Sequence, residues 1–195
     1  MKTHKIALTG GPGGGKTTAA DLFQRELRDQ LVMVPEAATI LFRGGFPRTG
    51  ESAVMRATQR AIYHVQKNLE ESITAHCPGR SLLCDRGTVD GAAYWPGAIE
   101  DFFSAVNANY EEELRCYDAV LFFETAAKGG DMIEGNNPVR NESLEQAIQL
   151  DEKLRDIWSK HPNFHIVNHQ KSFFKKITLG VEHLHEIFES LKNGH

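Results

Sequence analysis

Eight consecutive residues near the N-terminus have the composition of a phosphate-binding loop. Residues 10–17 read Gly-Gly-Pro-Gly-Gly-Gly-Lys-Thr and fit the pattern G-x-x-x-x-G-K-[ST] in full. Glycines let backbone N–H groups turn toward phosphate oxygens, and the helix that follows presents its positive end. The pattern assigns Lys16 to the β and γ phosphates of a nucleoside triphosphate and the Thr17 hydroxyl to Mg²⁺. The nucleotide-binding residues predicted here are Gly10, Gly11, Gly13, Gly14, Gly15, Lys16, Thr17 and Thr18.

Two carboxylates follow two short apolar runs that are typical of buried strands. Glu36 comes after the run 31–35, and Asp85 comes after the run 81–84 with Arg86 beside it. In an open parallel sheet, ligands bind beyond the carboxyl ends of the strands. We therefore expect Asp85 to hold Mg²⁺ with Thr17, and Arg86 to neutralise charge on a transferring phosphoryl group. Glu36 is then available as the base that takes the proton of an acceptor hydroxyl.

A glycine-rich stretch, about residues 125–141, has the features of a lid that closes over phosphates. It supplies two cations, Lys128 and Arg140, and we expect Arg140 to stabilise charge during transfer. The turn that begins at Asn168, after the apolar run 164–167, is where a nucleotide base would lie in this type of fold.

Polar residues elsewhere are candidates for an acceptor pocket. Arg43 and Arg48 flank a Gly-Gly-Phe-Pro loop. Gln59, Tyr63 and Gln66 share one face of a predicted long helix by their spacing, and would suit a base or an amide ring; the alternative is an ordinary polar helix side. After Asp85, the residues Asp90 and Tyr94 either bind a ribose hydroxyl or lock the loop, and the resulting substrate candidates are Arg43, Gln59, Asp90 and Tyr94.

Apolar runs and helical periodicity alternate along the whole chain. Strands are predicted at 5–9, 31–35, 81–84, 119–123 and 164–167, with helices at 16–29, 51–75, 142–160 and 173–191, helical material around 99–114, and irregular structure over 37–50. This alternation predicts βαβ units and a doubly wound α/β fold with a parallel sheet. The aromatic pairs 102–103, 122–123 and 173–174 are expected in the core.

Composition limits the classes of protein that remain. The chain has 195 residues and a net charge of −4, which favours one domain over residues 1–195 and argues against nucleic acid as a partner. Three scattered cysteines without a CxxC pattern suit reduced thiols. No apolar run reaches the length of a membrane span, so we expect a cytoplasmic protein that does not contact membranes.

Hydrolytic functions fit the sequence less well. A motor ATPase usually needs a second carboxylate beside the one that binds Mg²⁺, and the neighbour of Asp85 is Arg86. A small GTPase would carry an Asn-Lys-x-Asp motif, which does not occur, and Asp85-Arg-Gly-Thr88 is not its Asp-x-x-Gly switch. Glu124, after the run 119–123, is a second candidate for the Mg²⁺ carboxylate and ranks below Asp85.

Four segments together resemble the NadR-type family of P-loop proteins. They are the P-loop, Val34-Pro-Glu-Ala-Ala38, the block that runs from Cys84 to Tyr94, and the stretch from Asn137 to Glu142. That family groups the nicotinamide riboside kinase domain with an animal translocation-defect protein with an AAA-type domain and with bacterial ATP-binding proteins. The resemblance covers about residues 4–190. It implies a kinase-like P-loop fold with strand order 2-3-1-4-5 and an arginine-bearing lid.

The resulting functional hypothesis is an ATP- and Mg²⁺-dependent phosphotransferase acting on a small nucleoside- or nucleotide-like acceptor. Its expected catalytic residues are Lys16, Glu36, Asp85, Arg86 and Arg140. The alternative from another class is a regulatory nucleotide-binding switch with slow hydrolysis, whose lid and Arg43–Arg48 loop report the bound nucleotide to a partner.

Overall fold

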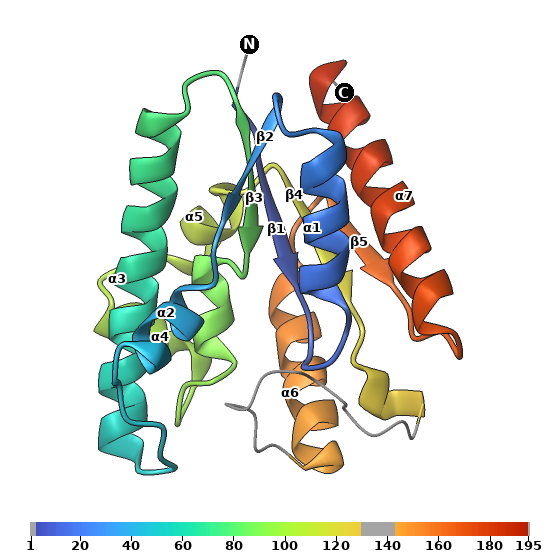
Figure 1. Cartoon of the computed structure of the whole chain (residues 1–195). Helices are drawn as coiled ribbons and strands as arrows, with labels where there is room; N and C mark the ends of the chain where they lie inside the picture. The colour runs from blue at the N-terminus through green and yellow to red at the C-terminus, as the bar shows by residue number, and fades with distance from the viewer. Residues whose placement is uncertain (1–2, 130–142, 195) are drawn as a thin grey trace.

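The fold is built on one five-stranded parallel sheet. The computed structural model describes residues 3–129 and 143–194. The strands are β1 (Lys5–Thr9), β2 (Leu31–Val34), β3 (Ser81–Asp85), β4 (Ala119–Phe123) and β5 (Phe164–Val167), in the order β2-β3-β1-β4-β5 (Figure 1). The predicted fold class and strand order are confirmed.

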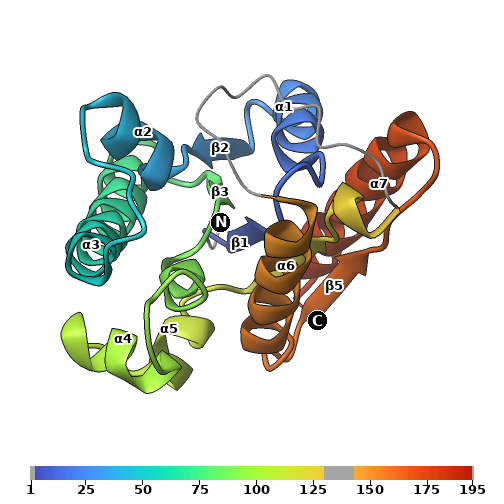
Figure 2. The ribbon, with the colours of Figure 1, turned by 90° about the horizontal axis from the view of Figure 1, so that it is seen from below.

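Helices cover both faces of this sheet, because side chains along each strand alternate between two apolar cores. On β1, Ile6 and Leu8 pack with α1 (Lys16–Glu26) and α7 (Phe173–Lys192), whereas Ala7 faces the other core. That second core contains α3 (Ser52–His76), α4 (Ile99–Ala105), α5 (Tyr110–Arg115) and α6 (Leu144–Trp158). The result is a three-layer sandwich in which α1 and α7 lie together on one side (Figure 2).

The sheet register brings the candidate residues to one edge. Leu8 of β1 lies opposite Asp85 of β3, and Thr9 lies opposite Phe122 of β4. All four strand pairs are parallel, so the segments that follow β1, β2, β3 and β4 leave the sheet at the same edge. The P-loop, Glu36 and Asp85 therefore meet there.

Several elements differ from the sequence-based expectation. A helix, α2 (Ala37–Arg43), occupies a segment that we expected to be irregular, and it ends at Gly44. The helical material around 99–114 is split into α4 and α5, and two short 3₁₀ helices, η1 (Thr88–Ala92) and η2 (Ala126–Gly129), were not predicted. The alanines and leucine of α2 were a readable helix signal, but the glycines and proline that follow them outweighed it.

Two of the three aromatic pairs lie in the core. Phe102, Phe103, Phe122 and Phe123 are buried, but Phe173 and Phe174 are 56% and 81% exposed at the start of α7. The expectation for this third pair was wrong, because both side chains lie in the first turn of α7, in the wall of an open groove that this turn shares with α1. Most of the predicted lid, including Arg140, falls outside the described residues. Within the described part of the chain, no helix has both the length and the hydropathy needed to cross a membrane.

One lysine is buried between α7 and the end of β4. Lys176 is 3% exposed, and its ammonium group donates to the backbone carbonyl of Glu124. Burial lowers the pKa of Lys176 to about 8, against the opposing charges of Asp151 and Glu124. The folded state therefore holds this proton less tightly than the unfolded chain does.

This lysine makes stability depend on pH in a defined direction. Between about pH 8 and pH 10.5 the unfolded chain binds the Lys176 proton while the folded state has released it, so the free energy of unfolding rises with pH. We expect wild type to gain roughly 1–3 kcal/mol relative to Lys176→Met between pH 7 and pH 10, measured by urea unfolding. The exposed neighbour variant Lys175→Met should show no such pH-dependent difference. A difference between wild type and Lys176→Met that stays constant with pH would contradict the prediction.

Candidate functional site

The P-loop between β1 and α1 has a conformation that only glycine adopts easily. Gly10, Gly13 and Gly15 have φ angles of 124°, 68° and 91°. A Cβ atom on Gly10 would lie 2.0 Å from the carbonyl oxygen of Phe123, so no side chain fits there. The loop leads into α1, whose first turn carries no acidic residue that would compete with an anion. This arrangement suits the phosphates of a nucleotide.

Lys16 lies within this loop and is buried. Its ammonium nitrogen donates to the carbonyl oxygens of Gly10 and Gly11, at 2.9 and 2.7 Å. These two carbonyls are neutral groups of the loop itself, and a phosphate would be a stronger hydrogen-bond partner for the charged ammonium. The geometry keeps the lysine beside the position that it would contact in a nucleotide complex.

Thr17 and Asp85 place two oxygen ligands side by side. The Thr17 hydroxyl lies 3.5 Å from the Asp85 carboxylate. Burial raises the pKa of Asp85, and the negative charge of Glu36 adds to this effect, whereas Arg86 and Lys16 oppose it. A divalent cation would compensate this crowding of negative charge, and hydroxyl and carboxylate oxygens are the ligands that Mg²⁺ prefers. The two residues fit a Mg²⁺ site.

Arg86 is a buried cation that connects the P-loop to the carboxylates. Its guanidinium donates to the carbonyl oxygen of Gly10 at 2.6 Å, and lies 3.2 Å from Asp90 and 3.4 Å from Glu36. Burial works to lower the pKa of Arg86, but the electrostatic influence of Tyr94, Asp90 and Glu36 outweighs it and raises the pKa above its ordinary value. Arg86 therefore remains charged in the site.

Asp90 orients the Arg86 guanidinium through an ion pair. Its carboxylate accepts from the Thr9 hydroxyl at 2.8 and 3.0 Å and from the indole N–H of Trp158 at 2.5 Å, besides its ion pair with Arg86. Gly87 completes the arrangement, since a Cβ atom there would lie 2.7 Å from the Trp158 ring. These contacts favour the interpretation that Asp90 locks the loop, while direct binding of a ribose hydroxyl by Asp90 stays a prediction.

A cavity of about 250 Å³ opens beside the P-loop residue Pro12. It lies between α2, α3 and η1 and combines apolar with polar side chains. The structure brings to its wall the residues that the sequence suggested as base, as phosphoryl-stabilising cation and as acceptor contacts, namely Glu36, Arg43, Arg48, Gln59, Tyr63, Gln66, Arg86, Asp90 and Tyr94. Residues that lie 58 positions apart in the sequence thus meet around one space large enough for part of a small molecule.

Other predicted residues lie away from this cavity. Thr18 is exposed and lines a separate groove with the first turns of α7. Asn168 is exposed after β5, and its contact with a base stays a prediction. Lys128 of η2 is ion-paired with Glu124 at 2.9 Å and with Asp151 at 3.4 Å, so its charge is directed at carboxylates and not at the P-loop.

Sequence reasoning missed one residue that holds the P-loop. Asp151 of α6 is fully buried, and one of its carboxylate oxygens accepts from the backbone N–H groups of Gly11 and Thr125 at 2.9 and 2.8 Å. A signal was present, because Asp151 lies on the same helical stripe as Ala147 and Leu154, and a carboxylate among core positions is uncommon.

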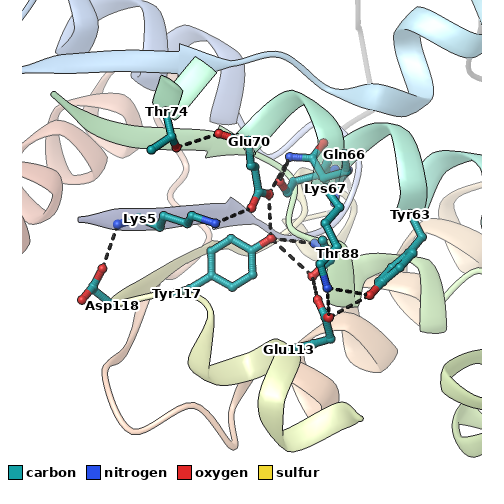
Figure 3. Close-up of polar contacts among 11 residues, drawn as sticks. Lys5, Tyr63, Gln66, Lys67, Glu70, Thr74, Thr88, Glu113, Tyr117 and Asp118 are labelled. Atoms are coloured by element: carbon teal, nitrogen blue, oxygen red, sulfur yellow. Dashed lines mark hydrogen bonds and ion pairs between the residues drawn. The ribbon is translucent and has the colours of Figure 1, made fainter. Parts of the chain in front are cut away.

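A second missed group lies behind the cavity, where α3, α5 and η1 meet. Glu70, Glu113 and Tyr117 are buried and joined by hydrogen bonds to Lys5, Lys67 and Thr88 (Figure 3). Glu70 follows Gln66 by one helical turn, so the same stripe of α3 that marked the acceptor candidates could have indicated it.

Comparison with known proteins agrees with this architecture. A family model described as an AAA domain matches residues 5–174. The structure of thymidylate kinase from Candida albicans superposes with a TM-score of 0.67 at 17% sequence identity, over 100% of this chain and 94% of that chain. No curated protein matches the chain significantly. Since the family model spans most of the 195 residues, the chain belongs to the AAA domain family of P-loop proteins, and it has the fold of a P-loop kinase.

Proposed function

We propose that this protein is an ATP- and Mg²⁺-dependent phosphotransferase that phosphorylates a hydroxyl group of a small nucleoside- or nucleotide-like acceptor. One observation carries the proposal: the cavity of about 250 Å³ adjoins the P-loop and has Glu36 and Arg86 in its wall. A protein that only hydrolyses its nucleotide needs room for water at this position, whereas a kinase needs a second substrate site next to the terminal phosphate.

The nucleotide would be held by the P-loop. Its backbone N–H groups and Lys16 would bind the phosphates, and Thr17 and Asp85 would hold Mg²⁺. Bound Mg²⁺ supplies positive charge that orients the phosphate oxygens and neutralises charge as the phosphoryl group transfers. Asn168 would contact the base.

Glu36 is the proposed base. Its carboxylate accepts from the Thr39 hydroxyl and lies 3.4 Å from the Arg86 guanidinium, so both neighbours orient it. Glu36 would take the proton of the acceptor hydroxyl as the oxygen attacks the terminal phosphorus. Arg86, with Arg140 from the lid, would stabilise the negative charge of the transferring group.

The acceptor is proposed from the cavity wall and from two resemblances. Phe42, Met55 and Ile62 offer apolar surface for a flat ring, while Arg43 and Gln59 offer polar contacts. Thymidylate kinase has the same fold, and the NadR-type resemblance adds nicotinamide riboside to the compounds worth testing. The three cysteines are free thiols, which fits the proposed cytoplasmic location.

One observation favours a regulatory switch as the second candidate. Lys16 and Arg86 both donate to the carbonyl oxygen of Gly10. If a bound phosphate drew Lys16 away from this carbonyl oxygen, Arg86 would be the one of the two donors that stays bonded to it. Nucleotide binding could in this way change the environment of Arg86 and of the neighbouring cavity wall without phosphoryl transfer.

ADP release distinguishes the two candidates. Purified protein is incubated with Mg-ATP alone and with nucleosides, nucleotides or nicotinamide riboside, with Lys16→Ala as the blank because it removes the charge that binds the phosphates. We expect at least one compound to increase ADP release and Lys16→Ala to abolish it. Slow release that no compound changes would favour the switch.

Replacing Glu36 with Gln tests the proposed base. The amide cannot take the proton, so we expect kcat for the best acceptor to fall by about 100-fold or more, with the Kd for ATP changed by less than about threefold. The control is Glu71→Gln, which alters an exposed carboxylate of α3 and should leave both values unchanged. Intact phosphorylation by Glu36→Gln would disprove this role even if the fold and the nucleotide site are correct.

Replacing Asp90 with Asn tests the positioning of Arg86. The amide can still bind Thr9 but no longer compensates the buried guanidinium, so we expect kcat to fall by about tenfold while the KM for ATP changes little. Steady-state kinetics with a thermal unfolding control would check this. A stable Asp90→Asn protein with wild-type kcat would show that Arg86 does not depend on this ion pair.

A further inference from the structure

Three polar side chains of α3 lie at the cavity although they are buried. Gln59, Tyr63 and Gln66 are 8%, 3% and 2% exposed, and all three line the cavity. They lie on successive turns of one helical face. Buried polar groups in a wall that a ligand can reach are candidates for specific recognition, provided that their hydrogen bonds are not all satisfied within the protein.

The amide group of Gln66 is satisfied on one side only. Its nitrogen donates to the carboxylate of Glu70 at 3.0 Å and to the backbone carbonyl oxygen of Arg86 at 3.1 Å, which uses both N–H bonds. Its oxygen, Oε1, is buried without a hydrogen-bond partner among residues 3–129 and 143–194. Of the residues that line the cavity in this part of the chain, only Gln66 has such an atom.

The orientation of this amide is determined by its partners. Turning the group by 180° would place Oε1 against a carboxylate and a carbonyl oxygen, both of which are acceptors, and would leave two N–H bonds unpaired. The unsatisfied group of Gln66 is therefore an acceptor and not a donor. The matching ligand group is a hydrogen-bond donor.

This orientation of Gln66 requires that Glu70 act as a hydrogen-bond acceptor, and the polar network around Glu70 supports that role. The oxygen of Glu70 that accepts from Gln66 also accepts from the Tyr117 hydroxyl at 2.8 Å, and its other oxygen lies 3.2 Å from the ammonium group of Lys5 (Figure 3). Tyr117 in turn accepts from the backbone N–H of Thr88 at 2.8 Å. The Glu70 carboxylate is thus contacted from three directions by donors.

The surroundings of Gln66 favour a ring over a sugar as the source of the donor. Tyr63 lies one turn away on the same face, and its hydroxyl is already engaged with Glu113 at 2.7 Å, so its ring offers mainly apolar contact. Ile62 and Tyr94 also line the cavity. The carboxylate and guanidinium of Glu36 and Arg86 form the part of the wall where polar sugar hydroxyls are better accommodated.

We infer that Gln66 accepts a hydrogen bond from an N–H group on the planar ring of the phosphoryl acceptor. The substrate class is then a nucleoside whose ring carries such a donor, as an amine, an imide or a carboxamide. This inference rests on the proposed function, because it takes the cavity to be the acceptor site. It predicts that this cavity binds an analogue without the N–H donor more weakly, because the Gln66 oxygen would then stay unpaired.

Matched ligand pairs test the inference by binding alone, without turnover. Isothermal titration calorimetry in the absence of ATP would compare adenosine with purine riboside, thymidine with N3-methylthymidine, and nicotinamide riboside with 3-acetylpyridine riboside. In each pair the second compound lacks the N–H donor. For the pair that binds most tightly, we expect wild type to prefer the donor compound by about tenfold.

Variants of α3 assign that preference to Gln66. In Gln66→Met, which keeps the side-chain length without the amide, the preference should fall to within about twofold. Asn68→Met, on the exposed side of α3, should retain the wild-type preference. Glu70→Gln should weaken it as well, because the new amide no longer excludes the turned orientation of Gln66. Thermal unfolding shows which variants are folded. The ratio of the Kd values of two ligands, measured on the same preparation, does not depend on the fraction of the protein that is active.

Four results would overturn the inference. The first is a wild-type protein that binds both members of its best pair equally, and the second is a preference that persists in folded Gln66→Met. The third is that none of these nucleosides binds. The fourth is that Gln66→Met changes only the preference for a ribose over its 2′-deoxy analogue, measured in the same way. Failure of the proposed function is recognised separately, as N–H-dependent binding through Gln66 without any acceptor-stimulated ADP release.

Discussion

The charge of Arg86 is buried at the centre of the candidate site, and the surrounding structure compensates it. A buried guanidinium is costly unless it is paired and hydrogen-bonded. Here Glu36, Asp90 and the carbonyl oxygen of Gly10 surround it, and each comes from a different segment of the chain. Arg86 also has a φ angle of 77°, a conformation that costs roughly 1 kcal/mol for a residue with a side chain. Such strain persists only where the surrounding contacts determine it.

This constraint explains the residue types that follow Arg86. Gly87 leaves room for the Trp158 ring, whose N–H reaches Asp90, and Asp90 in turn binds Arg86 and Thr9. Through Trp158 the end of α6 is connected to the same cluster, while Asp151, two turns earlier, holds the P-loop through Gly11. One helix therefore supports both the phosphate-binding loop and the cation beside it.

The polar network between α3, α5 and η1 has a different role. Glu70, Tyr117, Thr88 and Glu113 satisfy one another inside an otherwise apolar layer, which fixes how α3 packs beside the cavity. Gln66 adjoins this network through Glu70, and its oxygen has no hydrogen-bond partner among residues 3–129 and 143–194. The network and the cavity wall are thus parts of one arrangement.

The sequence by itself determined the fold class and the nature of the P-loop. Periods of apolar residues predicted the five strands and the main helices, and the pattern from Gly10 to Thr17 predicted a phosphate cradle, because these signals depend on residues close together in the chain. The sequence also named Glu36, Asp85 and Arg86 as candidates, since strand ends meet at one edge of a parallel sheet. The helix α2 was missed because the glycines and proline that follow it outweighed its helix-forming residues. The exposure of Phe174 was missed because local pattern does not show which neighbouring elements cover a side chain. Only the tertiary structure decided that Asp90 and Asp151 support the site from within the core, and which side of the Gln66 amide remains free, because hydrogen-bond partners distant in sequence are defined only once the layers have packed.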